Sequence, residues 1–391
     1  MKLLQELTQK DLEGKKVLLR VDFNVSLAEQ LVTSNSQLPI TNYQLPKIED
    51  FKIKSHLETI NYLLDNGASV VMVSHIDPPM DSFTTIVEQI AKVLGHELPL
   101  ISLSDFLTTN HSLPTANLVL VDNIRQDPRE VQNDETFAQE LSKDFDFYVN
   151  DAFASVHRKH ASVSAVTKFL PSYVGFLIKK EAAALQAVMD TPAEGKILVM
   201  GGAKISTKLP VIQNFLAKAE KILIGGALAN DFFQANKISV GASLVDQTPV
   251  PELDQNIVLL PQDILVTNDK TGNGTISARP VQNIESDELI ADVGPQSAEL
   301  FAEIIESAKM VIWNGPMGLS EVAGFAKGTE IIAKAVASSA GSIIGGGDTI
   351  TAVDKLGLLG KMGLVSTGGG AMLSFLSGEK LPGLEALGYY D

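Results

Sequence analysis

Cysteine is absent from this sequence of 391 residues. Its absence excludes disulfides, thiolate metal sites and cysteine nucleophiles, and it leaves the redox compartment open. Positive charge is also scarce, because 31 Lys and Arg residues stand against 47 Asp and Glu residues and give a formal net charge of -16. Nucleic acids attract proteins with a basic face, so neither nucleic acid nor an anionic membrane surface is an expected partner. An anionic small molecule is still possible if basic residues gather locally.

Long apolar runs are missing as well. No run approaches the roughly 18 apolar residues of a transmembrane helix. The first 16 residues, MKLLQELTQKDLEGKK, are charged throughout and lack the apolar centre of a signal peptide. A cytoplasmic location is therefore expected. Neither G-x-x-x-x-G-K-[ST] nor G-x-G-x-x-G follows an expected strand, which disfavours P-loop NTPases and dinucleotide dehydrogenases.

The sequence does contain many short apolar runs that alternate with longer stretches of helical periodicity. Most of these runs are rich in Val, Ile and Leu without alternation, which is typical of strands buried on both faces of a parallel sheet. This order predicts an α/β fold with two doubly wound, Rossmann-like parallel sheets. The expected strands are 15–23, 67–74, 117–123, 146–151, 196–202, 221–226, 263–269, 310–315, 342–348 and 363–370.

The expected strands end differently in the two halves of the chain. Those of the first half end in polar side chains, whereas most of the second half end in two or three glycines. Open α/β sheets bind ligands at the carboxyl ends of their strands, so the halves are expected to bind different ligands. A helix over 175–190, rich in Ala, Leu, Lys and Glu, is expected to join them. The polar stretch 33–47, with QLP twice, is expected to be a surface loop without a direct functional role.

The second half carries candidate phosphate-binding residues. Glycines after a strand can form an anion-binding nest, and a following helix adds its dipole; the alternative for 367–370 is a tight turn. Lys204 and Lys208 would share a helix face beside a polyphosphate, or else be solvated surface lysines. Asp348 could hold Mg²⁺ that bridges phosphates, or cap a helix. Glu321 is a candidate partner for ribose hydroxyls.

The first half carries candidate basic residues at or just beyond its strand ends. Arg125, His157, Arg158 and His160 could together form a local basic site in an acidic protein. The alternative is that the histidines are structural.

Taken together, these stretches resemble the phosphoglycerate kinase family. The likeness covers nearly the whole chain and keeps the order of the motifs, and the combination is much more specific than any single motif. The motifs are KKVLLRVDFNV, DNIR, NDAFASVHRKHAS, GGAKISTK, IGGALANDFF, WNGPMG with Glu321, GGGDT, VSTGGGA and LPGLEAL.

The resemblance implies two α/β domains that face a cleft and close about a hinge helix. It implies reversible phosphoryl transfer between ATP and the carboxylate of 3-phosphoglycerate, giving ADP and 1,3-bisphosphoglycerate. Mg²⁺ with ATP or ADP, small-molecule substrates and a monomeric state follow from the same likeness. The implied divisions are a phosphoglycerate-binding domain at 1–173, the hinge at 174–190, a nucleotide-binding domain at 191–378, and a segment at 379–391 that returns to the first domain.

The resemblance also assigns roles by position. The catalytic residues would be Lys204, Lys52, Gly368, Gly369 and Gly370, with Lys204 stabilising the phosphoryl group in flight. The phosphoglycerate would be bound by Asp22, Asn24, His75, Arg125 and Arg158. The nucleotide would be bound by Gly202, Ala203, Lys208, Gly225, Gly226, Asn314, Glu321, Gly347, Asp348 and Thr349, and Asp348 would also hold Mg²⁺.

The departures from the family pattern cluster on the acid-binding side. Lys52 stands where the family has a central arginine, and lysine keeps the charge but loses the bidentate fork. The family's SHLGRP reads SHIDPP, so Pro78 replaces another arginine and Asp77 adds a carboxylate. Each lost charged hydrogen bond costs about 1.5–3 kcal/mol. Smaller departures are Ser26, Gln126, Ala154, Thr207 and Ser320.

These departures leave three readings open. The first is an active, divergent phosphoglycerate kinase. The second is a nucleotide-binding protein of the same fold with an impaired phosphoglycerate site. The third is a kinase for another small carboxylate.

Overall fold

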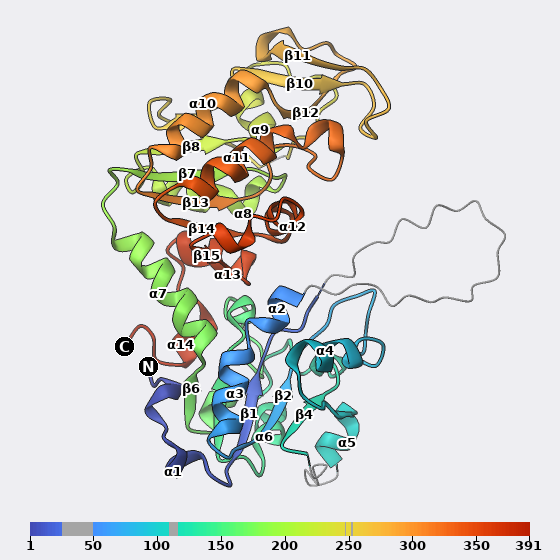
Figure 1. The fold of residues 1–391 in the computed structure, drawn as a ribbon, viewed down its shortest axis with the longest axis vertical. Coiled ribbons are helices and arrows are strands. Elements are labelled where there is room, and N and C mark those ends of the chain that lie inside the picture. The colour runs from blue at the N-terminus through green and yellow to red at the C-terminus, as the bar shows by residue number, and fades with distance from the viewer. Residues whose placement is uncertain (26–49, 109–115, 247, 252) are drawn as a thin grey trace, which may run out of the picture. The chain divides into compact units, whose positions relative to one another are not determined.

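The computed structural model describes residues 1–25, 50–108, 116–246, 248–251 and 253–391 (Figure 1). The predicted loop at 33–47 and the departure at Ser26 lie outside these described residues. The chain folds into two compact units, one made of Met1–Ala182 with Lys380–Asp391 and the other of Ala183–Glu379. Within the described ranges, no helix combines the length and the apolar character that a bilayer span requires.

The first unit contains a six-stranded parallel sheet with the order β3-β4-β2-β1-β5-β6. The chain runs from β1 to β2 on one side and later places β5 on the other side of β1, so the strand order reverses between β1 and β5. Such a reversal opens a crevice at the carboxyl ends of the strands. The strands are β1 (Lys16–Arg20), β2 (Ser69–Val73), β3 (Leu100–Ile101), β4 (Leu118–Val121), β5 (Phe147–Asn150) and β6 (Ser172–Val174).

Helices cover both faces of this sheet, because alternate residues of a strand point to opposite faces. Val17 and Leu19 of β1 pack in one apolar cluster with helices α3 and α4, while Leu18 packs in a second cluster with Phe137 and Leu141 of α6. The helices of this unit are α1 (Gln9–Leu12), α2 (Asp50–Lys54), α3 (Leu57–Asp65), α4 (Val87–Leu94), α5 (Leu103–Thr108), α6 (Glu135–Ser142) and α14 (Pro382–Ala386).

The second unit contains another six-stranded parallel sheet, with the order β15-β14-β13-β7-β8-β9. Here the order reverses between β7 and β13. Its core surrounds the fully buried Trp313, with Val199 and Phe301 in the same apolar cluster. The strands are β7 (Lys196–Met200), β8 (Lys221–Ile224), β9 (Val258–Leu259), β13 (Met310–Asn314), β14 (Ser342–Gly345) and β15 (Leu364–Val365).

A small antiparallel sheet with the order β11-β10-β12 completes the strands of this unit. The strand predicted over 263–269 is β10 of this sheet and does not join the parallel series. A short apolar run does not reveal the direction of its neighbours, so periodicity could not separate the two cases. The antiparallel strands are β10 (Asp263–Thr267), β11 (Ile276–Pro280) and β12 (Leu289–Val293).

Six helices complete the second unit as far as the structure describes it, and a further helix, α7 (Phe176–Asp190), begins in the first unit and ends in the second. The helix predicted over 175–190 is therefore present, and its role as a hinge stays a prediction, as do the predicted domain boundaries. The six are α8 (Ile205–Phe215), α9 (Leu228–Ala235), α10 (Pro295–Glu306), α11 (Lys327–Ser338), α12 (Gly347–Lys355) and α13 (Gly369–Leu376). The predicted fold class, with two doubly wound parallel sheets, is confirmed.

Candidate functional site

Polar side chains of the first unit gather at the carboxyl ends of four neighbouring strands. Asp22 and Asn24 follow β1, His75 follows β2, Arg125 follows β4, and Arg158 follows β5 after a longer loop. The middle of each strand is apolar and buried, and most of the polar residues lie at or just beyond the strand ends. The five phosphoglycerate-binding residues predicted in this unit therefore lie at one edge of one sheet.

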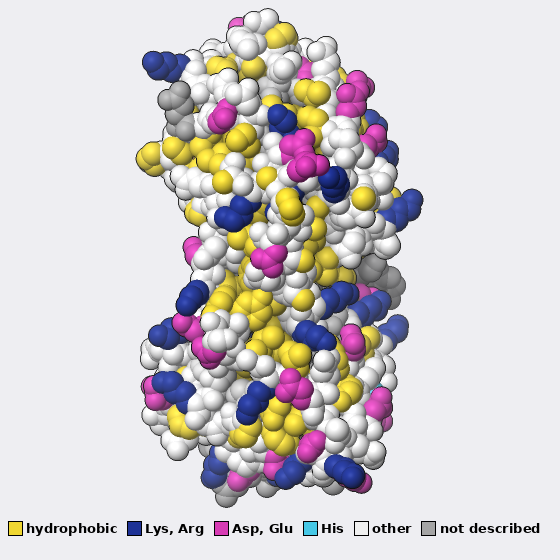
Figure 2. All heavy atoms as spheres, turned by 90° about the vertical axis from the view of Figure 1, so that its left-hand side faces the viewer, with side chains coloured by type: hydrophobic (Ala, Val, Ile, Leu, Met, Phe, Trp, Pro, Cys, Tyr) yellow, Lys and Arg dark blue, Asp and Glu magenta, His cyan; other side chains and the backbone are white. Residues whose placement is uncertain are grey.

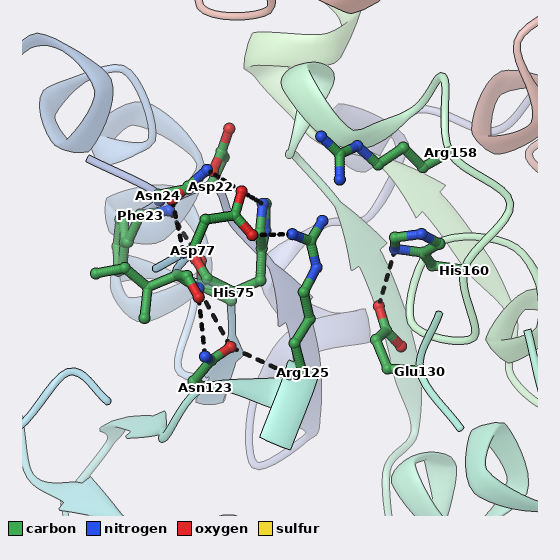
Figure 3. A network of polar contacts seen from close by, with 12 residues as sticks. Asp22, Phe23, Asn24, His75, Asp77, Asn123, Arg125, Glu130, Arg158 and His160 are labelled. Carbon is green, nitrogen blue, oxygen red and sulfur yellow. Dashed lines mark hydrogen bonds and ion pairs between the residues drawn. The ribbon is translucent and has the colours of Figure 1, made fainter. Parts of the chain in front are cut away.

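A carboxylate that the motif comparison only noted as an addition lies at the centre of this group. Asp77 pairs with Nη1 of Arg125, and its Oδ2 accepts a hydrogen bond of 3.0 Å from Nδ2 of Asn24. Nε2 of His75 lies 4.0 Å from the same oxygen. Figure 3 shows the Arg125 guanidinium between Asp77 on one side and Arg158 and His160 on the other.

Half of the Arg125 guanidinium is left for another partner. Its Nε and Nη2 atoms are buried, and neither finds a hydrogen-bond acceptor among the described residues. Buried polar atoms are normally paired, so two adjacent donors without an acceptor indicate a place for a ligand oxygen. Burial lowers the pKa of Arg125, and the Asp77 carboxylate counteracts this effect. A guanidinium in this setting stays protonated and binds an anion well.

Arg20, which sequence reasoning took as part of an apolar strand, fixes the tautomer of His75. Arg20 is fully buried at the end of β1, and its Nη2 donates to Nδ1 of His75 at 3.1 Å. A guanidinium can only donate, so Nδ1 is an acceptor and the neutral ring carries its proton on Nε2. That N–H is a donor on the Asp77 side of the site.

The pKa values of the three histidines in this site are lowered by burial and by the neighbouring arginines. Burial, followed by repulsion from Arg20 and Arg125, holds the pKa of His75 well below its usual value. Burial, followed by repulsion from Arg125 and other arginines, lowers the pKa of His160 to about 4. Burial and Arg158 also lower the pKa of His157. Neutral histidines beside three guanidiniums are typical of a site prepared for an anion.

Glu130 is a fully buried carboxylate on the Arg158 and His160 side of this group. Its side chain accepts hydrogen bonds from Ser162 N at 2.8 Å and Ser162 Oγ at 2.7 Å, while Nδ1 of His160 lies 3.8 Å away. Burial raises the pKa of Glu130, and Arg20 opposes that rise.

The molecular surface shows no comparable gathering of one charge on the face drawn in Figure 2. Acidic and basic side chains are interspersed there over both units.

Lys52, which stands in the place of the family's arginine, also reaches this site. It lies on α2, and its Nζ donates to the backbone oxygen of Asn24 at 2.9 Å. The structure therefore brings Lys52 together with Asn24 and, through Asn24, with Asp77. Pro78 contributes no donor to the site.

A histidine that sequence reasoning missed holds Asp22 in place. The backbone N–H of Asp22 donates to Nε2 of the buried His56 at 3.0 Å. Nδ1 of that ring must then carry the proton, and it donates to Oδ2 of Asp151 at 2.8 Å. Oδ1 of Asp151 accepts from Leu177 N, in the first turn of α7, at 2.9 Å. Because His56 and Asp151 are 95 residues apart, no local motif could have paired them.

In the second unit, the loops after β7, β8 and β13 pack backbone against backbone. Gly202 N donates to Pro316 O at 2.8 Å, and Gly226 N donates to Met317 O at 2.8 Å. Gly202 and Gly226 have φ values of +74° and +61°. A Cβ on Gly226 would come within 2.6 Å of Gly202 N. These two predicted nucleotide-binding glycines are therefore required by loop packing, and their N–H groups already have partners.

Gly347 is different, because the protein itself does not require a glycine there. A Cβ at Gly347 would meet nothing within 4 Å, its φ is not in the left-handed region, and it is exposed at the first position of α12. The first N–H groups of a helix have no partner within the helix. A glycine at this position leaves the start of α12 open to the close approach of a ligand.

The loops that precede α12 and α13 lie against each other. A Cβ at Gly369 would come within 3.0 Å of Cα of Gly346. Gly368 caps α13, which begins with Gly369 and Gly370, so two helix N-termini are presented side by side. Paired helix N-termini favour a phosphate electrostatically.

Two predicted nucleotide-binding residues are engaged in holding these loops. Thr349 is fully buried, and its Oγ1 accepts from Gly315 N at 2.7 Å. Asn314 is buried, and its Nδ2 donates to Gly345 O at 2.9 Å. Thr349 thus ties the first turn of α12 to the loop after β13, and Asn314 ties the end of β13 to the end of β14.

The two predicted lysines occupy different environments. Lys204 is exposed at the N-cap of α8, whereas Lys208 is only 7% exposed and donates to Gly201 O at 2.5 Å. Burial lowers the pKa of Lys208 to about 8; Asp348 opposes this effect and Lys204 adds to it. Lys204, Lys208 and Asp348 are therefore electrostatic neighbours, and the two lysines differ in burial.

The remaining predicted nucleotide-binding residues are spread over the same loops. Ala203 and Glu321 are exposed, and Gly225 is buried, where a Cβ would come within 2.5 Å of Met317 Sδ. A hollow of about 940 Å³ lies elsewhere in this unit, between α9 and the antiparallel sheet. None of the predicted nucleotide-binding residues lines it.

Asp348 fits a nucleotide-borne Mg²⁺ better than a resident metal. In the part of the chain that the structure describes, no three carboxylates or histidines gather into a metal-binding group. Mg²⁺ typically takes one or two carboxylates and completes its shell with phosphate oxygens and water. A single exposed carboxylate in the first turn of α12, close to Lys208, meets that requirement.

Comparisons with known proteins agree with this arrangement. The profile of the family described as "Phosphoglycerate kinase" matches residues 7–379. The chain is 40% identical over 399 residues to a phosphoglycerate kinase of Roseiflexus castenholzii (96% of this chain and 97% of that protein) and 38% identical over 393 residues to one of Herpetosiphon aurantiacus (96% of each). The solved phosphoglycerate kinase of Coxiella burnetii covers 99% of this chain and matches over 98% of its own length, with 30% identity and a TM-score of 0.80. This chain belongs to the phosphoglycerate kinase family.

Proposed function

We propose that this protein transfers a phosphoryl group reversibly between ATP and the carboxylate of 3-phosphoglycerate, giving ADP and 1,3-bisphosphoglycerate. One observation carries the proposal beyond family membership: the first unit gathers three arginines with neutral histidines and leaves two buried guanidinium donors of Arg125 without an acceptor. 3-Phosphoglycerate carries a phosphate and a carboxylate, and both favour charge-assisted hydrogen bonds of this kind.

The acid is held by the first unit in this proposal. Arg125 and Arg158 bind its anionic groups, with the unpaired Nε and Nη2 of Arg125 as a bidentate edge. The Nε2–H of His75 and the ammonium of Lys52 add single donors, and Asp22 and Asn24 orient the ligand's hydroxyl. The buried Nε and Nη2 of Arg125 would thereby gain an acceptor that the described residues do not supply.

The nucleotide is held by the second unit. Lys208 binds phosphate, and the N-termini of α12 and α13 bring Gly347 and the glycines 368–370 to it. Thr349 and Asn314 support these loops. Asp348 holds Mg²⁺, which when bound neutralises phosphate charge, and Glu321 binds the ribose. The loops that carry Gly202, Ala203, Gly225 and Gly226 line the place of the adenosine.

The proposed phosphoryl transfer depends on the positioning of the substrates and on charge stabilisation, and not on proton transfer by the protein. Phosphoryl transfer depends chiefly on alignment and on stabilising the charge of the moving group. The attacking carboxylate is already ionised, so no general base is needed, and histidines that are neutral at pH 7 are no obstacle. Lys204, exposed at the start of α8, places its ammonium near the group in transit. The predicted closure about 174–190 completes the proposal, because it would exclude water and prevent ATP hydrolysis.

A coupled turnover assay with Mg-ATP and 3-phosphoglycerate tests the proposal. Wild-type protein should turn over, and Lys204→Ala should lower kcat by roughly 100-fold or more, because a charge-stabilising donor is lost. Lys218→Ala, which removes another lysine of the second unit, is the control and should leave kcat unchanged. Turnover that is unaffected by Lys204→Ala would contradict the assigned mechanism. Lys52→Arg and Pro78→Arg, tested alongside, should raise activity if the departures weaken the acid site.

We also propose a cytoplasmic monomer that acts on small molecules, as the family resemblance implies. The test is the mass of the protein in solution by light scattering, where a mass of one chain is expected. A stable dimer would contradict this part of the proposal.

A further inference from the structure

The carboxylate of Asp77 lies where the acid substrate should bind. It pairs with Nη1 of Arg125 and accepts from Nδ2 of Asn24, and both residues belong to the proposed phosphoglycerate site. The Nε2–H of His75 lies on the same side, 4.0 Å from Oδ2 of Asp77. The Asp77 carboxylate, an anion of the protein itself, therefore already occupies donors of two acid-binding residues, Arg125 and Asn24, and lies close to a third, His75 (Figure 3).

We propose that Asp77 is a specificity-determining residue that competes with the oxygens of 3-phosphoglycerate for Arg125 and Asn24. The inference rests on the proposed function. In its terms, the acid can reach the unpaired Nε and Nη2 of Arg125 at any time, but it engages Nη1 of Arg125 and Nδ2 of Asn24 only when the Asp77 carboxylate has released them. Affinity for the acid is then reduced in proportion to the fraction of molecules in which the donors are available.

The loop that carries Asp77 does not need this carboxylate in order to hold its course. Asp77 N donates to Oδ1 of Asn24 at 3.0 Å, and Ile76 is held on both sides of its peptide by Asn123, with Ile76 N to Oδ1 at 3.2 Å and Nδ2 to Ile76 O at 2.9 Å. The Asp77 side chain is 39% exposed, against 13% for Arg125. An exposed carboxylate on an independently anchored loop can turn toward water while the guanidinium stays in place.

The charge balance supports competition over a role in binding the acid. 3-Phosphoglycerate is an anion, so a carboxylate at its binding position repels it. Asp77 also removes one of the positive charges that the site presents, by pairing with Arg125. The adjacent Pro78 supplies no compensating charge, so the loop after β2 weakens acid binding in two ways.

The test measures binding of 3-phosphoglycerate by titration calorimetry in wild type, Asp77→Asn and Asp77→Gly, together with kcat and KM. Asp77→Asn keeps the size of the side chain and removes its charge. We expect it to lower the Kd and the KM for 3-phosphoglycerate roughly tenfold, with the KM for ATP and kcat little changed. Asp77→Gly should act in the same direction.

Asp81→Asn is the matched control. Asp81 is exposed on the same stretch of chain; its backbone oxygen accepts hydrogen bonds from Asn123 and Gln126, and its carboxylate bonds to none of the described residues. This variant makes the same change in net charge without touching Arg125, and it should leave the Kd unchanged. An equal gain in Asp81→Asn would overturn the inference, because a long-range charge effect would then explain the result.

The remaining outcomes separate the inference from the proposed function. Unchanged or weaker acid binding in both Asp77 variants, in a protein that turns over, overturns the inference alone. Tighter acid binding in the Asp77 variants without turnover in any variant supports the inference and contradicts the kinase reaction. Failure of all variants to bind 3-phosphoglycerate overturns both.

Discussion

The protonation state of Lys208 should make the affinity for Mg-ADP depend on pH. It is buried beside the loop after β7, and burial lowers its pKa to about 8. Only the protonated form can bind a nucleotide phosphate as a cation. Affinity for Mg-ADP should therefore fall as the pH rises through 8, in a range where phosphate groups of the nucleotide no longer titrate.

The magnitude follows from the fraction of protonated lysine. With a pKa of about 8, that fraction is about 0.9 at pH 7 and about 0.1 at pH 9, so the Kd for Mg-ADP should rise about tenfold. Stability of the ligand-free protein should move the opposite way. Because the folded pKa lies below the ordinary 10.5, the unfolded chain binds more protons between pH 8 and 10.5, and the free energy of unfolding rises with pH there, by up to about 3 kcal/mol from this group.

Calorimetric titration of Mg-ADP between pH 7 and pH 9, repeated in buffers of different ionisation enthalpy, measures both the Kd and the proton uptake. Lys208→Met is the reference, since it cannot titrate; its Kd should be weaker and flat with pH, and its unfolding free energy should lack the rise above pH 8. A wild-type Kd that does not change with pH would refute the reasoning. The same slope in Lys208→Met would assign the titration to another group.

Three further predictions concern single residues. Gly347→Ala should weaken Mg-ADP binding at least tenfold with little change in unfolding free energy, whereas Gly360→Ala, equally unobstructed, should leave the Kd unchanged; equal effects would contradict a ligand contact at Gly347. Asp151→Asn should cost about 2 kcal/mol in denaturant unfolding and raise the KM for 3-phosphoglycerate, because its carboxylate is fully buried and both oxygens are engaged. Asp146→Asn, whose carboxylate accepts from Lys15 and Lys16 N but is 35% exposed, should cost less than about 1 kcal/mol and leave the KM alone. Because the pKa of His160 is lowered in the folded protein, the unfolded chain binds more protons between pH 4 and 6.5. The free energy of unfolding should therefore fall as the pH falls through this range, and it should fall less steeply in His160→Asn. Equal slopes of unfolding free energy against pH in the two proteins would contradict the lowered pKa.

The fold could be predicted because buried parallel strands leave a plain trace in sequence. KVLLR in β1 and KILVM in β7 are continuous apolar runs, as a strand covered on both faces must be. Short edge strands such as β6 and β9 leave no such trace, and they were not predicted. β10 has the composition of a buried strand but pairs with antiparallel neighbours, and that choice depends on contacts distant in sequence.

The site residues predicted from the sequence follow strands or match motifs of the family. Asn24, His75 and Arg125 do so, and the sheet brings them together. His56 precedes a helix and acts through Asp151, and Arg20 is hidden in an apolar run, so neither position suggests a functional role. Their pairing depends on the strand order of the sheet, and the sequence contains no local signal of it.

For glycines and for charged residues alike, the residue type in the sequence does not reveal the role that the neighbouring residues give it. Glycine-rich loops look alike in the sequence, yet a Cβ at Gly226 would clash with the backbone of Gly202, whereas a Cβ at Gly347 would meet nothing within 4 Å. Likewise, Asp77 adds one negative charge to the net charge of the chain, as any aspartate does. Its effect on the site comes from its ion pair with Arg125. Exchanging a glycine for an aspartate in a loop would ordinarily be a surface change of small effect. Beside Arg125, the aspartate carboxylate competes with 3-phosphoglycerate for the same guanidinium. The effect of the residue therefore depends on its neighbour and not on its type.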